Sequence, residues 1–67
     1  MIELQINGER RRFERAPDVA HLVDALGLAG KRIAVEVNGE IVPRSRHGMT
    51  ALADGDRLEI VVAVGGG

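Results

Sequence analysis

Residues 35–44 read Val-Glu-Val-Asn-Gly-Glu-Ile-Val-Pro-Arg, a stretch that predicts a β-hairpin. Apolar residues alternate with small or polar ones over residues 33–38, which is the period of a strand with one buried face. Asn38-Gly39 then favours a type I′ turn, because both central positions of that turn need a positive φ. Residues 40–42 form the expected return strand, and Pro43 ends it or confines it to a sheet edge.

The same turn signal occurs near the start of the chain, where Asn7-Gly8 predicts a first hairpin. Residues 2–7 alternate in the same way as residues 33–38. A two-residue turn fixes the register of the two strands, which gives the opposite pairs Ile6–Glu9, Leu4–Arg11 and Ile2–Phe13. The only aromatic residue, Phe13, therefore falls on the apolar face.

A short amphipathic helix is predicted between the two hairpins. Asp18 is the expected N-cap, because its carboxylate can accept hydrogen bonds from the first turn. Gly27 or Gly30 can adopt the left-handed conformation that ends a helix, with Leu28 packed against the last turn. Apolar residues at i, i+3, i+4 and i+7 form the face that must pack on the sheet, namely Val19, Leu22, Val23 and Leu26.

The sequence after Pro43 predicts a polar, irregular loop that extends to Ala53 and is anchored to the core by Met49 and Leu52. Asp54-Gly55-Asp56 is a turn signal before the last strand. In that strand the residues expected to face the core are Leu58, Ile60, Val62 and Val64, and those expected on the other side are Glu59, Val61 and Ala63.

The order of these elements is a hairpin, a helix, a hairpin, a long loop and a strand. This ββαββ pattern predicts an α+β fold in which one helix packs on one face of a mixed sheet. The last strand is expected in the middle of the sheet, parallel to the first, because that position hides the most apolar strand. We expect residues 1–64 to form the domain and residues 65–67 to form a flexible glycine tail.

The composition suits a small globular protein without thiol chemistry. The 67 residues include no cysteine, which excludes disulfides, thiolate metal sites and a cysteine nucleophile. The formal net charge is −1, so no overall field favours nucleic acid or anionic lipid. No apolar run approaches the length that spans a bilayer, about 20 residues, and no signal-peptide pattern is present. We therefore expect a cytoplasmic protein with no nucleic-acid or membrane partner.

No group of side chains predicts catalysis or metal binding. The sequence shows no nucleophile–base pair and no phosphate-binding glycine loop, so we do not expect an enzyme or a bound cofactor. His21 and His47 lack the spacing of metal ligands and are expected on the exposed side of the helix and in the loop. The arginines at positions 10, 11, 12 and 15 indicate a solvated strand edge.

Three side chains are candidates for contact with a partner. Val61 and Ala63 face away from the core of a strand where polar residues are usual. Either a partner covers them, or they are isolated exposed apolar residues, which are common. Arg44, with Arg46, lies in an irregular segment that could equally be a partner contact or a solvated loop.

The last three residues, Gly65, Gly66 and Gly67, end the chain in a backbone carboxylate. Glycine has no Cβ, so such a tail can pass through a narrow channel and leave its terminal carbonyl open to attack. Three extended residues reach about 10 Å. A frayed terminus without a function is the alternative.

These features together resemble one known family. The resemblance rests on the opening strand, the 35–44 hairpin, the turn at 52–56 and the glycine ending, residues 62–67, and residues 37–44 are the most specific part. On these residues the chain resembles the β-grasp sulfur carriers, in particular the ThiS family of thiamine biosynthesis.

The resemblance implies a cycle in which the C-terminal Gly67 carries sulfur. A ThiF-like adenylyltransferase would use ATP and magnesium to convert the Gly67 carboxylate into an acyl adenylate. A persulfide donor would then supply sulfur to give a thiocarboxylate, and thiazole synthase (ThiG) would take that sulfur for the thiazole ring of thiamine. Gly66 would thread the channel, and Gly65 would act as a spacer.

Three other functions fit the same fold. A carrier of molybdopterin synthase shares the fold and the chemistry, but it tends to be longer and to have a proline before its terminal glycines. A ubiquitin-like modifier would join Gly67 to lysines of target proteins. A passive interaction domain would leave the terminus unmodified.

Overall fold

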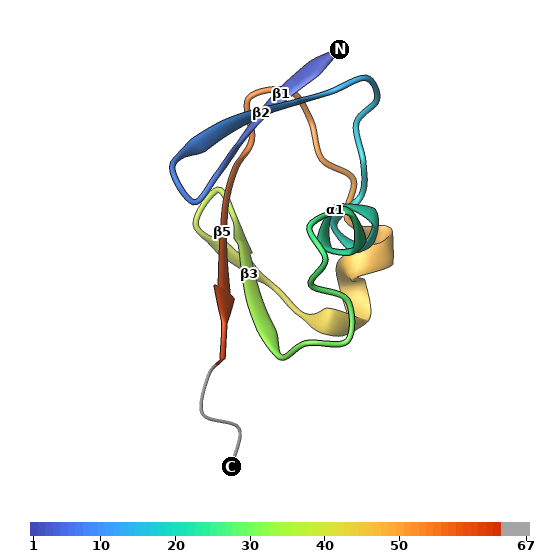
Figure 1. Cartoon of the computed structure of the whole chain (residues 1–67), viewed down its shortest axis with the longest axis vertical. Helices are drawn as coiled ribbons and strands as arrows, with labels where there is room; N and C mark the ends of the chain where they lie inside the picture. Colours follow the sequence, from blue (N-terminus) through green and yellow to red (C-terminus); the bar gives the residue numbers. More distant parts are fainter. Residues whose placement is uncertain (64–67) are drawn as a thin grey trace.

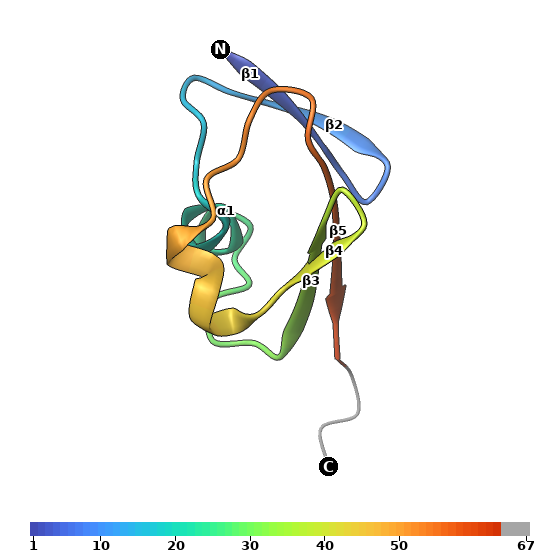
Figure 2. The ribbon, with the colours of Figure 1, turned by 180° about the vertical axis from the view of Figure 1, so that it is seen from behind.

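The fold is a single mixed sheet with one helix packed against one face, as Figure 1 and, from behind, Figure 2 show for a computed structural model of the chain. The structure describes residues 1–63. The elements are β1 (Ile2–Ile6), β2 (Glu9–Phe13), α1 (Val19–Ala25), β3 (Ile33–Val37), β4 (Glu40–Val42), the 3₁₀ helix η1 (Arg44–Met49) and β5 (Arg57–Val62).

The strand order confirms the predicted α+β topology. The five strands lie in the order β2-β1-β5-β3-β4, with β5 parallel to β1 and antiparallel to β3. The ββαββ pattern is therefore followed by η1 and then by β5, which returns to the centre of the sheet. A central position gives the apolar strand β5 neighbours on both edges.

The two Asn-Gly turns set the hairpin registers as predicted. Asn7 and Asn38 have φ angles of 52° and 51°, and the glycines that follow them have φ angles of 84° and 85°. Positive φ at both central positions is the type I′ geometry, whose twist matches that of the strands. The pairs Ile6–Glu9, Leu4–Arg11 and Ile2–Phe13 are all present.

Helix α1 is capped at both ends by the residues that the sequence indicated. The Asp18 carboxylate accepts a hydrogen bond from the His21 backbone N–H at 2.7 Å. At the other end Gly27 has a φ of 74°, and the Leu28 N–H donates to the Val23 carbonyl oxygen at 3.0 Å. This is a Schellman motif, and it directs Leu28 back onto the core.

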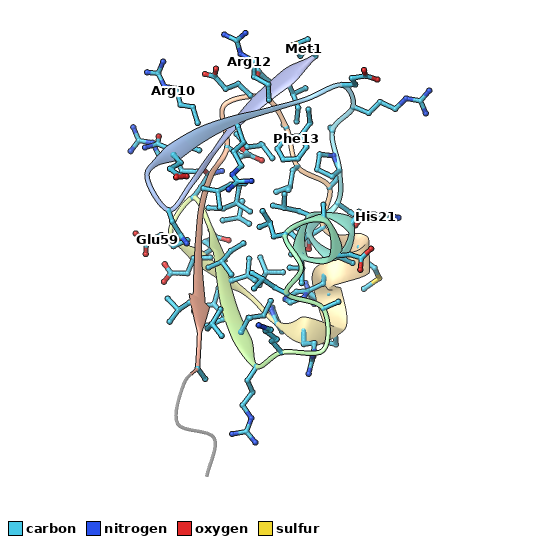
Figure 3. All side chains as sticks on the ribbon, in the orientation of Figure 1. Met1, Arg10, Arg12, Phe13, His21 and Glu59 are labelled. Atoms are coloured by element: carbon cyan, nitrogen blue, oxygen red, sulfur yellow. The ribbon has the colours of Figure 1, made fainter. Side chains whose placement is uncertain are left out.

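The core lies between α1 and the helix-facing side of the sheet. Its fully buried side chains are Leu4, Val19, Leu22, Val35 and Leu58. Figure 3 shows Phe13 directed from β2 towards the helix, and Glu59 directed from β5 away from it.

The segment after β4 differs from the prediction. It forms η1 instead of an irregular loop, and Met49 is 77% exposed, so the prediction that Met49 anchors it was wrong. Leu52 is buried as expected, and the second anchor is His47, which is 8% exposed. A 3₁₀ helix has three residues per turn, so Met49, two residues after His47, points in another direction.

The only helices in residues 1–63 are short, and none of them is long and apolar enough to cross a membrane.

Candidate functional site

The candidate site is the end of β5, because this strand leads directly into the glycine tail. The predicted carrier Gly67 and the predicted partner-binding residues Gly65 and Gly66 lie outside the described residues, as does Val64. The structure therefore describes the part of the domain next to the tail. This part consists of the end of β5, the open face of the sheet and the segments beside them.

Strand β5 is held unequally by its two neighbours. Along β3 it pairs over five residues, from Ile33–Val62 to Val37–Leu58. Along β1 it pairs only at Gln5–Arg57 and Ile6–Leu58, because β1 then turns away. Without a further contact, the backbone in the second half of β5 would have no hydrogen-bond partner on the β1 side.

The side chain of Asn7 supplies that contact. Its Nδ2 donates to the Ile60 carbonyl oxygen at 3.0 Å, and the Ile60 N–H donates to its Oδ1 at 2.8 Å. A carboxamide carries the same donor and acceptor as a peptide group, so Asn7 extends the β1 edge by one residue. Sequence reasoning assigned Asn7 to the turn alone and missed this role.

Asn38 makes a similar contact at the start of β5. The Arg57 N–H donates to Asn38 Oδ1 at 3.0 Å, and Asn38 Nδ2 donates to Asp56 Oδ1 at 3.0 Å. Both hairpin turns therefore fasten β5 through their asparagine side chains. The only sequence signal for this was the repeated Asn-Gly-Glu.

The open face of the sheet carries an exposed apolar patch, which we define as Ala34, Ile41 and Val61. Val61 is 61% exposed and lies opposite Ala34 on β3, and Ile41 on β4 is 65% exposed. Ala63 is also exposed, just beyond the end of β5. The predicted orientation of Val61 and Ala63 away from the core is confirmed, while their contact with a partner stays a prediction.

Two acidic residues lie next to this patch. Glu36 on β3 is directly opposite Glu59 on β5 and also opposite Ile41 on β4. Like charges on opposite residues of neighbouring strands destabilise a sheet. Arg57 lines the same hollow as both glutamates, so a basic side chain of the domain itself lies near the pair.

Arg44 lies at the end of the sheet from which the tail leaves. Its side chain is exposed, and its Nη2 donates to the Lys31 carbonyl oxygen at 3.4 Å. The Ala63 N–H donates to the carbonyl oxygen of the next residue, Arg32, at 2.9 Å. Arg44 is thus beside the base of the tail, while its contact with a partner stays a prediction.

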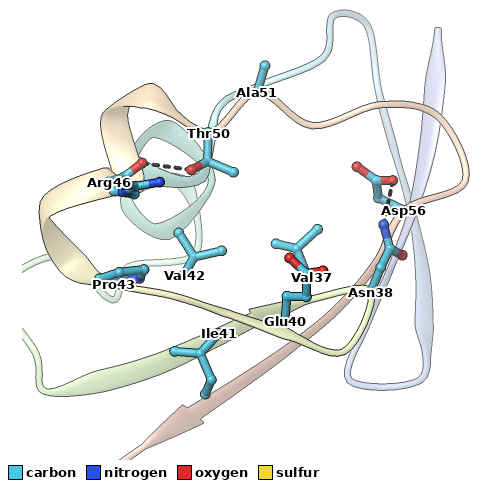
Figure 4. A pocket seen from close by; sticks show the side chains of 10 residues that line it. All are labelled: Val37, Asn38, Glu40, Ile41, Val42, Pro43, Arg46, Thr50, Ala51 and Asp56. Carbon is cyan, nitrogen blue, oxygen red and sulfur yellow. Dashed lines mark hydrogen bonds between the residues drawn. The ribbon is translucent and has the colours of Figure 1, made fainter.

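A hollow of about 700 Å³ lies between the β3–β4 hairpin and the segment that joins η1 to β5 (Figure 4). Three of its polar side chains bond within the protein: Asn38 to Asp56, and the Thr50 hydroxyl to the Arg46 carbonyl oxygen at 2.8 Å. The first contact joins the hairpin to the segment before β5, the second closes the end of η1, and both suit a structural role.

The ring of each histidine lies within hydrogen-bond distance of another group of the protein. His21 is on the exposed side of α1, as expected, and its ring nitrogen Nδ1 lies 2.8 Å from Asp18 Oδ1. Hydrogen bonds from the backbone and then the side chain of His21 lower the pKa of Asp18 from its ordinary value of 3.8. His47 Nε2 lies 3.2 Å from the Val42 carbonyl oxygen. Among the residues described, no three His, Cys, Asp or Glu side chains are grouped to hold a metal ion.

Comparison with known proteins places this geometry in a family. The model of the ThiS family matches residues 4–67, which is nearly the whole chain. The chain belongs to the ThiS family.

The relatives include both separate carriers and larger proteins. The sulfur carrier protein ThiS of Bacillus subtilis is 35% identical over 65 residues, which cover 96% of this chain and 98% of that protein. A thiazole synthase of Paramagnetospirillum magneticum is 47% identical over 66 residues, 98% of this chain, but the chain spans only 20% of that protein's length. A similar segment therefore forms part of a protein named thiazole synthase.

A solved structure supports the same family and the β-grasp fold. The crystal structure of the thiamine biosynthesis protein ThiS from Geobacter metallireducens matches with a TM-score of 0.83 and 32% sequence identity. The match covers 98% of this chain and 100% of that one. The fold class predicted from the sequence is confirmed for this member of the ThiS family.

Proposed function

We propose that the chain is a sulfur carrier for the formation of the thiamine thiazole, and that Gly67 is the residue that carries the sulfur. The single observation that carries this proposal is the match to the ThiS family, which extends through residue 67. The chain would be a co-substrate that partner enzymes act upon, and not itself an enzyme.

The proposed chemistry begins with activation of the C-terminal carboxylate. A carboxylate is a poor electrophile, so a carboxylate oxygen of Gly67 attacks the α-phosphorus of ATP on an adenylating enzyme, and pyrophosphate leaves. Magnesium on that enzyme offsets the phosphate charge. The product is an acyl adenylate with a good leaving group. We propose that the carrier binds no cofactor of its own.

Sulfur then replaces the adenylate. The terminal sulfur of a persulfide attacks the Gly67 carbonyl carbon and AMP leaves. A second thiol breaks the S–S bond, so the thiocarboxylate is released and the two donor thiols end as a disulfide. Glycine at this position leaves room for the tetrahedral intermediate in a narrow site. Because the cycle consumes ATP, we expect it to run in the cytoplasm.

We propose that thiazole synthase receives the sulfur, and that both enzymes dock on the open face of the sheet. The larger relatives named thiazole synthase, which contain a segment similar to this chain, support the first point. The exposed Val61 and Ile41 support the second, since an apolar surface of a partner would cover both.

Intact-mass spectrometry tests the proposal. The chain is incubated with ATP, magnesium, an adenylating enzyme that is active on the Bacillus subtilis carrier, and a persulfide source. A mass gain equal to one oxygen-to-sulfur exchange is expected, and a chain without Gly67 should show none. Oxidation of a methionine adds nearly the same mass, and Met1 and Met49 are 84% and 77% exposed.

The position of the added mass distinguishes formation of the thiocarboxylate from oxidation of a methionine. Fragmentation must place the added mass on the C-terminal peptide, and an alkylating reagent must modify it. A chain that shows no gain while the Bacillus subtilis carrier is converted would refute the proposal.

A further inference from the structure

Three basic residues lie together at the end of the sheet where β5 stops. Lys31 and Arg32 precede β3, and Arg44 is the first residue of η1. The hydrogen bonds from Arg44 Nη2 to the Lys31 carbonyl oxygen and from the Ala63 N–H to the Arg32 carbonyl oxygen join these segments to the base of the tail. We call Lys31, Arg32 and Arg44 the basic collar.

The positive charge of the basic collar is not balanced locally. All three residues are exposed. The ion pairs found within residues 1–63 are Arg12–Glu3 and His21–Asp18, and neither includes a collar residue. The formal net charge of the chain is −1, so this cluster is not a by-product of a basic protein. Three like charges at one end of the domain repel each other, and no ion pair within residues 1–63 offsets this repulsion.

The reach of the tail puts the basic collar at the entrance of any site that acts on Gly67. Four residues follow Ala63 in the sequence, and a fully extended segment of that length spans at most about 14 Å. The surface that surrounds the entrance must therefore come close to the basic collar. Charges act strongly only within about 8 Å at physiological salt, so this surface would interact with the basic collar directly.

We infer that the basic collar recognises an acidic protein surface around the channel that admits the tail. The inference rests on the proposed function and extends it to the chemistry of the partner. A nucleic acid fits less well, because the chain carries a formal net charge of −1 and no overall field attracts a phosphate backbone. The complementary charges should speed the encounter and orient the domain with its tail towards the channel.

A pair of charge-matched variants tests this inference. Lys31→Glu with Arg32→Glu reverses two collar charges, and Arg11→Glu with Arg15→Glu makes the same change in net charge elsewhere. Arg11 lies opposite Leu4 in the β1–β2 hairpin, on the helix side of the sheet and not on the open face, and Arg15 follows β2. The readout is pyrophosphate release by the adenylating enzyme of the proposed cycle, measured against carrier concentration at several salt concentrations.

The collar variant should raise the KM for the carrier about tenfold at low salt and leave kcat unchanged, because steering affects the encounter and not the chemistry. Its KM should also depend less on salt than that of the unmodified chain. The control variant should keep the original KM within about twofold. Circular dichroism of both variants confirms that they remain folded.

Two results would overturn the inference. One is an unchanged KM for the collar variant, and the other is an equal rise for the collar and control variants, which would mean that total charge matters and position does not. If the unmodified chain releases no pyrophosphate while the Bacillus subtilis carrier does, the proposed function itself fails, and that outcome is distinct from the other two.

Discussion

Replacing Asn7 with alanine should destabilise the domain strongly, because its side chain completes the edge of β5. The variant loses two part-buried hydrogen bonds to Ile60, of 3.0 Å and 2.8 Å. At about 0.5–1.5 kcal/mol each, these contribute about 1–3 kcal/mol. Alanine at the Asn7 φ of 52° adds about 1–2 kcal/mol of backbone strain. The expected loss is therefore about 2–5 kcal/mol, a large part of the about 3–10 kcal/mol typical of such a short chain.

Urea denaturation followed by circular dichroism measures this loss, and two glycine variants isolate the side-chain contribution. Asn7→Gly and Asn38→Gly both keep a residue suited to positive φ, and each removes two hydrogen bonds. The bonds of Asn7 are part-buried, whereas those of Asn38 are exposed to solvent. Asn7→Gly should therefore lower the free energy of unfolding by more than Asn38→Gly. An equal or smaller effect of Asn7→Gly would refute the view that its carboxamide replaces a strand neighbour.

Three further predictions concern the core, the open face and the helix cap. Leu58→Ala removes a 2% exposed side chain and should cost about 2–5 kcal/mol in the free energy of unfolding, measured by urea denaturation. Val61→Asp should raise the KM of the adenylating enzyme for the carrier at least about tenfold and lower the free energy of unfolding by about 1 kcal/mol or less. Val61→Thr is the uncharged control, and equal KM values for the two variants would contradict the open-face interface. The lowered pKa of Asp18 means that its ionised form stabilises the fold above pH 3.8, and this contribution is lost as the pH falls through the pKa of the folded state. Melting temperatures of the unmodified chain should therefore fall relative to those of Asp18→Asn below pH 3.8, and parallel curves would argue against the cap.

The parts of the fold that local chemistry specifies were predictable from the sequence. Asn-Gly at two places fixed both hairpins and their registers, since the turn geometry leaves little choice of pairing. Asp18 and Gly27 marked the helix ends for the same local reasons. The position of β5 inside the sheet followed from its apolar composition, because an inner strand has neighbours on both edges.

The parts that depend on contacts between distant segments were not predictable. The choice of His47 and not Met49 as the second anchor depends on η1, whose three-residue turn has no strong sequence signal. The hydrogen bond between Asn7 and Ile60 joins residues 53 positions apart, and the sequence around neither residue predicts it. The basic collar likewise forms from two segments that only the fold brings together.

The placement of β5 also determines how the domain responds to a mechanical load. A partner that grips the tail and draws it inward pulls along the axis of β5, which lies between β1 and β3. The hydrogen bonds on its two edges run across that axis, so they resist the pull together and do not open one after another. A tail attached to an edge strand could be peeled from its single neighbour. We therefore expect the domain to remain folded when a partner pulls on its tail.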